Sequence, residues 1–347
     1  MPPNLLWLPL SVVISYRCLM TIAGHQLAGS DITIAPLGVG TWAWGDRSTW
    51  GMGTYDTELS LDTIREAWEA SIDAGATFFD TAEVYGSGES ERIIGGLRAA
   101  DPERAAKAVL TTKFMPVPWK LNVKTALLSS LRASLDRLGV DSVPLYQIHG
   151  PISLRGHGAL AEALAAAHQA GLVGAVGVSN YSVKEMRSID AELRKRDLRL
   201  ASNQIEFSLL RRVPETGGLL GACAELGVVP LAYSPLGQGR LTGKYSAANP
   251  PPGKRKFSAH PMEVVDGVVA ELRRIGEKHG GKAPGQVALN WIMVKGAVPI
   301  PGAKNRAQAL ENAGAMGWEI DGDDLAALDR AALPGLRSLA NRFWQHG

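Results

Sequence analysis

The sequence predicts a single α/β domain folded as a (β/α)8 TIM barrel. Short runs rich in Val, Ile, Phe and Tyr alternate along the chain with longer segments that have the apolar periodicity of helices. The runs are too short for typical helices and are as apolar as strands buried on both faces. The alternation repeats eight times, which is typical of a closed barrel; an open doubly wound sheet is the structural alternative.

The expected elements follow one another without a Gly/Ser linker or a low-complexity tract. The eight strands are expected at residues 34–42, 76–82, 108–114, 143–149, 173–180, 200–207, 228–236 and 297–302. Three intervening helical segments, 60–75, 122–139 and 157–171, close on a glycine, and the first opens on a Ser that can cap it. Residues 249–257 form a basic, Pro-rich loop, and the acidic segment 319–333 predicts a closing helix outside the repeat.

The first twenty residues differ in composition from the rest. A secretory signal carries its positive charge before the apolar run, but here the only Arg, Arg17, follows it. The run from Leu5 to Tyr16 is too short to span a bilayer. We therefore divide the chain into an N-terminal extension, 1–20, and a barrel, 21–347. The extension either precedes the real start, for which Met20 would serve, or is a disordered or surface-docked segment.

Composition and charge narrow the class of protein. With 347 residues, 46% hydrophobic and 20% charged, the chain is an ordinary globular protein able to bury a full core. The net charge of +2 argues against nucleic acid as the main partner. Two cysteines, Cys18 and Cys223, give neither a disulfide framework nor a metal-site spacing. We expect a reduced, cytoplasmic setting without membrane association, and the oligomeric state stays open.

Four side chains suited to proton transfer lie at the ends of consecutive expected strands. Asp80 and Tyr85 follow the second strand, Lys113 ends the third and His149 ends the fourth. TIM barrels carry their active sites at this end of the strands. A free phenol, with a pKa of about 10, is a poor acid at neutral pH, but a nearby cation lowers that pKa, and a carboxylate keeps a buried Lys charged. The set therefore predicts Tyr85 as a general acid–base group and His149 as a group that orients a substrate oxygen.

An anion-binding signal lies in the last barrel loop. Residues 301–312 form a glycine turn that enters a helix start, where backbone amides and the helix dipole suit a phosphate. Lys304 adds a positive charge to this turn. A G-x-G-x-x-A pattern at 38–43 matches the dinucleotide-binding fingerprint only weakly. That fingerprint should open a helix, but a Gly- and Trp-rich loop follows here. Backbone groups there can still approach a ligand, at Gly40, Thr41 and Trp42.

Several motifs, in order, resemble those of the aldo-keto reductase family. They are "FFDTAEVYG", "TTKF", "LYQIH", "VGVSNYS", "NQIEFSLL", "AYSPLGQGRLTGKY" and "PIPGAKNRAQALENAGA", within about residues 37–333. The nearest resemblance is to the larger bacterial and plastid members. It implies a catalytic tetrad of Asp80, Tyr85, Lys113 and His149, with Tyr85 as proton donor and NADPH as hydride donor to a small-molecule aldehyde or ketone. Glu83 is interpreted as a solvated or structural neighbour outside the site.

The resemblance also implies where the cofactor lies. The adenosine-phosphate half would be held by Gly302, Lys304, Gln308, Glu311 and Asn312. The charge of Lys304 would then lie where a 2′-phosphate sits, which favours NADPH over NADH. The pyrophosphate would be followed by Ser234, Leu236, Gly239 and Lys244. The nicotinamide would meet Ser179, Asn180 and Gln204, with Tyr233 beneath its ring.

The substrate pocket is expected to be apolar and aromatic, lined from the first, third and fourth strand ends and by the C-terminal tail. The candidates are Trp42, Trp44, Trp50, Met115 and Trp119. Gly150 follows His149 where many relatives carry a bulky or charged residue, so a roomier site is expected there. No metal is expected, because no His, Cys or carboxylate cluster has ligand spacing.

Other functional classes fit the sequence less well. "GVSNY" lacks the second glycine of a serine hydrolase elbow, and the seven His are too scattered for a metal-dependent barrel hydrolase. The remaining alternative is a non-catalytic NADPH-binding scaffold or sensor subunit of the same family, which an intact tetrad does not exclude.

Overall fold

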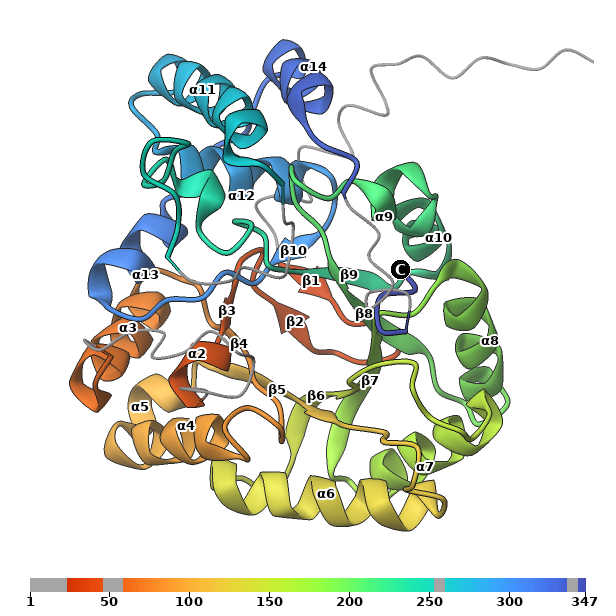
Figure 1. The fold of residues 1–347 in the computed structure, drawn as a ribbon. Coiled ribbons are helices and arrows are strands. Elements are labelled where there is room, and N and C mark those ends of the chain that lie inside the picture. The colour runs from red at the N-terminus through yellow and green to blue at the C-terminus, as the bar shows by residue number, and fades with distance from the viewer. Residues whose placement is uncertain (1–23, 46–58, 253–259, 336–342) are drawn as a thin grey trace, which may run out of the picture.

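Eight parallel strands curl into a barrel with helices around the outside (Figure 1). The structure is a computed structural model that describes residues 24–45, 59–252, 260–335 and 343–347. The strands are β3 (Gly38–Gly40), β4 (Phe78–Asp80), β5 (Val109–Phe114), β6 (Val143–Ile148), β7 (Val173–Ser179), β8 (Leu200–Glu206), β9 (Val229–Tyr233) and β10 (Val298–Pro299). Each of them falls within one of the eight predicted runs.

The strand order decides between the two predicted architectures. Neighbours run consecutively from β3 to β10, which a doubly wound sheet would not show. The barrel closes where the Gly40 amide donates to the Pro301 carbonyl at 2.9 Å and Gly40 pairs with Gly302 in a parallel bridge. The predicted TIM barrel is therefore confirmed, and the open-sheet alternative is wrong.

The outer layer consists of helices that connect successive strands or follow the last one. Their bounds are α2 (Trp42–Gly45), α3 (Leu61–Asp73), α4 (Glu89–Ala100), α5 (Pro102–Ala105), α6 (Val123–Leu138), α7 (His157–Gln169), α8 (Val183–Arg194), α9 (Val213–Thr216), α10 (Leu219–Leu226), η1 (Arg240–Thr242), α11 (Met262–Lys278), α12 (Pro284–Val294), α13 (Arg306–Ala313) and α14 (Gly322–Ala331). The Ser60 hydroxyl accepts from the Thr63 amide and caps α3, as predicted. Gly139, at the end of α6, has a φ of 65°, a left-handed conformation that favours glycine.

A short hairpin closes the amino end of the barrel. Its strands, β1 (His25–Gln26) and β2 (Thr33–Ile34), are antiparallel. Leu27 and Ile34 are fully buried and pack with Phe78, Leu145 and Leu231 from inside the barrel. This hairpin was not predicted, since two-residue strands give no periodic signal. It leaves the carboxyl end of the strands as the end available for a site.

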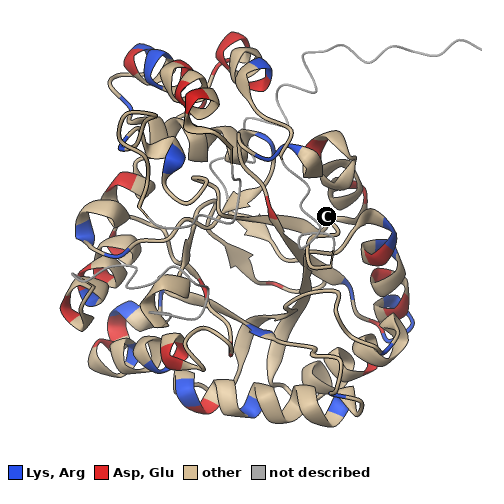
Figure 2. Ribbon diagram, viewed as in Figure 1, with Lys and Arg blue, Asp and Glu red and all other residues tan. Residues whose placement is uncertain are grey.

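The acidic segment near the end of the barrel forms α14, as predicted. Asp324 of α14 accepts from Arg274 and Lys278 of α11, at 2.9 Å each, and so ties the two helices together. Among the described residues, one group could hold a metal ion: His279, Asp321 and Asp324. Both of its carboxylates already accept hydrogen bonds, Asp324 from Arg274 and Asp321 from Lys278. Figure 2 shows acidic and basic residues interspersed along the outer helices.

Some predictions fall on residues that the structure does not describe. These are the extension at 1–20, with Cys18, and the candidate pocket residue Trp50. Cys223 is buried and unpaired. Within the described ranges, no helix combines the length and the apolar character needed to cross a membrane.

Candidate active site

The barrel brings the four predicted catalytic side chains to one place. Asp80 is the last residue of β4, Lys113 is the penultimate residue of β5, and His149 directly follows β6. Because these strands are parallel neighbours in register, their carboxyl ends meet at one rim. Tyr85 enters from the turn between β4 and α4.

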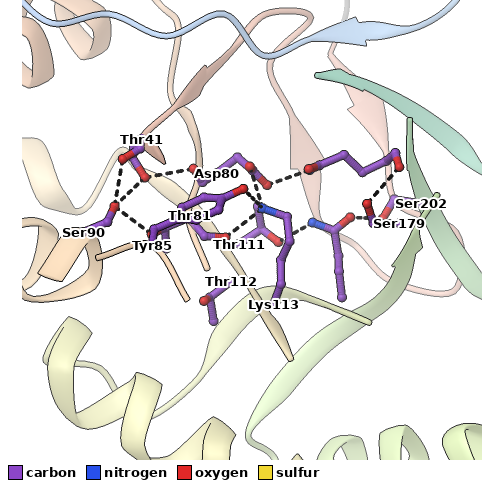
Figure 3. A network of polar contacts seen from close by, with 12 residues as sticks. Thr41, Asp80, Thr81, Tyr85, Ser90, Thr111, Thr112, Lys113, Ser179 and Ser202 are labelled. Carbon is purple, nitrogen blue, oxygen red and sulfur yellow. Dashed lines mark hydrogen bonds and ion pairs between the residues drawn. The ribbon is translucent and has the colours of Figure 1, made fainter. Parts of the chain in front are cut away.

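Lys113 lies at the centre of this group, between Asp80 and Tyr85 (Figure 3). Its ammonium donates to Asp80 Oδ2 at 2.7 Å, to the Thr81 carbonyl at 2.9 Å and to the Tyr85 hydroxyl at 3.3 Å. These three bonds use all three donors of the ammonium group. Lys113 is fully buried and Asp80 is 2% exposed. Burial lowers the pKa of Lys113, and the charge of Asp80 acts in the opposite direction.

The second carboxylate oxygen of Asp80 is bonded as well. Gln204, on β8, donates from Nε2 to Asp80 Oδ1 at 2.7 Å. The backbone carbonyl of Gln204 accepts from the backbone amide of Asn180 at 2.8 Å and from the Ser179 hydroxyl at 3.0 Å. The three residues predicted to meet a nicotinamide are thus hydrogen-bonded to each other and, through Gln204, to Asp80 of the predicted catalytic group.

His149 lies beside Tyr85, with ring centroids 5.7 Å apart in an edge-on arrangement. It is 7% exposed. Burial holds the pKa of His149 well below its usual range, and the charge of Lys113 lowers it further. The imidazole is therefore neutral at physiological pH. A neutral imidazole has one N–H, which can donate to a substrate oxygen.

A buried hydroxyl network fixes the turn that carries Tyr85. Thr41 Oγ1 donates to the Asp80 carbonyl at 2.9 Å, and Thr81 Oγ1 donates to Ser90 Oγ at the same distance (Figure 3). The backbone of Ser90 contributes as well: its amide donates to the Tyr85 carbonyl at 3.3 Å and closes the turn. The turn is held from both sides.

Glu83, in the same turn, has a structural part. Its Oε1 accepts from the Met115 amide at 2.7 Å and lies 3.5 Å from the Lys120 ammonium. The side chain therefore links the loops after β4 and β5, which agrees with the interpretation of Glu83 as a structural neighbour.

The predicted phosphate-binding residues come from the loops after β9 and β10, on the same rim. The loop after β9 contains left-handed conformations at Ser234 (φ 51°) and Gly239 (φ 89°). After β10, the chain enters α13 with Asn305 as its cap. Two predicted contacts also shape this loop: Gln308 Oε1 accepts from the Lys304 amide at 3.0 Å, and Asn312 donates to the Gly302 carbonyl at 3.2 Å.

The remaining predicted cofactor residues differ in exposure. Lys244 and Glu311 are exposed, and Leu236 is partly buried in the loop after β9. Gly40 and Thr41 lie on the opposite side of the barrel seam from Gly302. Gly40 has little room for a side chain, since a Cβ there would lie 3.0 Å from the Ile300 carbonyl oxygen.

Tyr233, at the end of β9, joins the nicotinamide group. Its hydroxyl donates to Asn180 Oδ1 at 3.0 Å, and Asn180 itself is in a left-handed conformation with a φ of 64°. Gln345, near the end of the chain, donates to the same hydroxyl at 2.8 Å. Burial raises the pKa of Tyr233, so its phenol stays neutral.

The predicted substrate residues are placed less uniformly. Trp44 is 1% exposed, its indole nitrogen donates to the Ala303 carbonyl at 2.7 Å, and its ring packs near Phe79, so it is a core residue without an open face. Trp42 begins α2, directly after Thr41. Met115 is partly buried after β5, whereas Trp119 is 76% exposed.

The expectation of a roomier site at Gly150 is wrong. The indole of Trp344 packs against Gly150 so closely that a Cβ there would lie 2.7 Å from the ring. The same ring lies 5.6 Å from the His149 ring, between centroids. The C-terminal tail was predicted to line the pocket, but nothing in the sequence singled out Trp344, because residues so far apart in the chain carry no common motif.

Comparison with known proteins gives a consistent picture. The family model described as "Aldo/keto reductase family" matches residues 36–332. The chain is 36% identical to the chloroplastic pyridoxal reductase of Arabidopsis thaliana over 331 residues, which cover 90% of this chain and 87% of that protein.

Solved structures match over a similar extent. A glycerol dehydrogenase from Gluconobacter oxydans matches with a TM-score of 0.76 and 28% identity, covering 91% of this chain and 98% of that one. An aldo/keto reductase from Klebsiella pneumoniae, solved in complex with NADP and acetate, matches with a TM-score of 0.67 and 26% identity, again covering 91% and 98%.

Proposed function

The chain belongs to the aldo/keto reductase family, and we propose that it uses NADPH to reduce the carbonyl group of an aldehyde or ketone to an alcohol. The observation that carries this proposal is the position of the Lys113 ammonium, 2.7 Å from Asp80 and 3.3 Å from the Tyr85 hydroxyl, beside a neutral His149. A phenol held against a buried cation is suited to give up its proton.

The reaction follows from what each side chain can do. Bound NADPH supplies a hydride for the carbonyl carbon. Tyr85 donates its proton to the carbonyl oxygen, and the Lys113 ammonium stabilises the phenolate that remains. Asp80 balances the buried charge of Lys113, and Gln204 holds Asp80 in place. His149, being neutral, donates a hydrogen bond that orients the carbonyl oxygen without adding a charge.

The residues along the rim fit the cofactor. Ser179, Asn180 and Gln204 form a connected set of amide and hydroxyl groups of the kind that a carboxamide needs, and the Tyr233 ring adjoins it. The amino end of α13 and the Lys304 charge suit a phosphate. We assign the adenosine-phosphate half to Gly302, Lys304, Gln308, Glu311 and Asn312, and the pyrophosphate to Ser234, Leu236, Gly239 and Lys244. The backbone at Gly40, Thr41 and Trp42 completes the proposed cofactor contacts.

The identity of the carbonyl compound is a separate question. The relatives carry names as different as pyridoxal reductase and glycerol dehydrogenase, so membership of the family leaves the substrate open. A first panel should therefore contain pyridoxal, glyceraldehyde and simple aromatic and aliphatic aldehydes.

The test is NADPH oxidation, followed by absorbance, with Tyr85→Phe as the decisive variant. Loss of the phenolic proton should lower kcat by about a hundredfold to ten-thousandfold, while NADPH binding, followed by tryptophan fluorescence, should be unchanged. Tyr146→Phe is the matched control. That tyrosine is fully buried on β6 and its hydroxyl has no hydrogen-bond partner among the described residues, so its loss should leave kcat unchanged.

Two results would count against the proposal. Tight NADPH binding with no oxidation by any carbonyl compound would favour the scaffold or sensor alternative. Full activity of Tyr85→Phe would leave a reductase but remove Tyr85 as its general acid.

A further inference from the structure

The last residues of the chain, 343–347, lie along the rim of the candidate active site; we call them the C-terminal segment. Each of three successive residues contacts a different part of the rim. Trp344 lies against His149 and Gly150, and the Gln345 amide nitrogen donates to Tyr233 and Glu206. The His346 amide donates to the Asn180 carbonyl at 3.1 Å. Because there are several such contacts, the position of the C-terminal segment does not depend on any one of them.

A buried ion pair at the end of β8 anchors this segment. Glu206 and Arg211, which are 2% and 3% exposed, lie 3.5 Å apart. Glu206 accepts from Gln345, and Arg211 donates to the Gly347 carbonyl at 3.1 Å. Removal of buried charges from water has a cost that is offset only by good partners. The C-terminal segment supplies two of those partners, so the barrel already contains a specific binding position for it.

Gly150 and Trp344 are complementary in shape. Gly150 has no left-handed backbone conformation that would require glycine. What excludes a side chain is the indole of Trp344, with three ring carbons between 2.7 and 3.1 Å from the position of a Cβ. The space beside the catalytic histidine is therefore filled from the other end of the chain.

The position of this ring bears on the substrate. His149 is the residue assigned to the carbonyl oxygen, and the Trp344 ring is edge-on to His149 at 5.6 Å. Trp344 is only partly buried, so it is not sealed inside the core. A substrate whose oxygen reaches Tyr85 and His149 must lie next to this ring. Flat aromatic groups gain from such contacts, whereas puckered rings of the same size are thicker.

We propose that Trp344 is a specificity-determining residue, whose indole forms a wall of the carbonyl pocket and favours flat aromatic aldehydes over saturated ones of equal size. This rests on the proposed reductase function. Gly150 is also required for this arrangement, because its lack of a side chain leaves the space that the indole occupies.

The experiment compares two aldehydes with the same carbon skeleton, benzaldehyde with a flat aromatic ring and cyclohexanecarboxaldehyde with a puckered saturated one. The measured quantity is the ratio of their kcat/KM values with NADPH, divided by the same ratio for the unaltered protein. This division cancels the different intrinsic reactivity of the two carbonyl groups. For Trp344→Ala, the benzaldehyde preference should fall about fivefold, within the range of one aromatic pair contact. Trp344→Phe should retain most of the preference.

Two further variants separate this role from a general effect on folding. Gly150→Ala should lower the same ratio, since its Cβ displaces the indole, but should have little further effect when combined with Trp344→Ala. Phe343→Ala is the matched control: Phe343 is 79% exposed and adjacent in the chain, so its loss should leave the ratio unchanged.

The outcomes are distinguishable. If the unaltered protein reduces both aldehydes and Trp344→Ala has the same ratio, the role of Trp344 is refuted while the reductase function stands. Additive effects of Gly150→Ala and Trp344→Ala would refute the shape complementarity. If the unaltered protein reduces neither these aldehydes nor any other carbonyl compound, the proposed function fails and the specificity proposal fails with it.

Discussion

At the scale of single residues, the candidate site is a chain of hydrogen bonds that starts at Gln204 and ends at Tyr85. Gln204 holds Asp80, Asp80 holds Lys113, and Lys113 reaches the Tyr85 hydroxyl. A buried ion pair is weak evidence for stability, because its desolvation cost offsets much of the attraction. Its presence here is better explained by the proposed reaction, in which Tyr85 releases a proton.

His149 gives this site a pH dependence that can be measured in the stability of the whole protein. Its pKa lies well below the value of 6.5 expected for the unfolded chain, because burial disfavours the charged form. Below pH 6.5 the unfolded state binds more protons than the folded one, so the free energy of unfolding falls as the pH falls. Between pH 6.5 and pH 5, this single group should remove about 1.5 kcal/mol.

The measurement is urea unfolding at the two pH values, for the unaltered protein and for His149→Gln. Since the variant cannot take up this proton, its free energy of unfolding should fall by about 1.5 kcal/mol less. His25 and His157, whose pKa values are also lowered by burial, remain in both proteins and cancel in the comparison. An equal fall in both proteins would mean that His149 is not held neutral by its surroundings.

At the scale of elements, the eight strands were predictable because strands buried on both faces are continuous apolar runs. Asp80, Lys113 and His149 followed from them, since a barrel brings consecutive strand ends to one rim. The hairpin of β1 and β2 was not predictable, because two-residue strands leave no pattern. The contact between Trp344 and Gly150 was missed for a different reason: it depends on where a terminal segment folds back, which local periodicity does not encode.

The hairpin predicts a separation between stability and activity. Leu27 is fully buried in the small core at the amino end of the strands, opposite the candidate site. Leu27→Ala should lower the free energy of unfolding by about 2–5 kcal/mol, as for other large-to-small changes in a core. Leu61→Ala, at a side chain that is 64% exposed on α3, should change it by about 0.5 kcal/mol or less.

Kinetics at a temperature where both variants are folded complete this test. The kcat of Leu27→Ala should match that of the unaltered protein, because the hairpin packs at the opposite end of the strands from the four proposed catalytic residues. A kcat that falls together with stability would mean that the two ends of the barrel are coupled.

At the scale of the whole molecule, the barrel has one weak seam. β3 and β10, of three and two residues, are short compared with β7 and β8, of seven residues each. The seam is joined by the Gly40–Pro301 hydrogen bond, the Gly40–Gly302 bridge and the bond from the Trp44 indole to the Ala303 carbonyl. The proposed cofactor contacts lie on both sides of this seam, at Gly40 and Thr41 and at Gly302 and Lys304. A bound cofactor would therefore bridge the seam.

This arrangement predicts that NADPH stabilises the fold, and more strongly than NADH does. At one hundred times its dissociation constant, NADPH should add about 2.7 kcal/mol to the free energy of unfolding. For a domain of this size that corresponds to a rise in Tm of roughly 3–5 °C. NADH at the same concentration should give a smaller rise, because it lacks the 2′-phosphate assigned to Lys304.

Lys304→Ala isolates the charge on which this preference depends. Loss of a charge-assisted hydrogen bond should weaken NADPH binding about tenfold or more and raise the KM for NADPH, while NADH binding should change little. Thermal unfolding and tryptophan fluorescence titration with each cofactor measure both effects. Lys184→Ala, at an exposed position on α8, is the control and should leave both cofactors unaffected. If Lys304→Ala weakened NADPH and NADH equally, the lysine would serve the phosphates that the two cofactors share, and the preference for NADPH would have to come from another part of the rim.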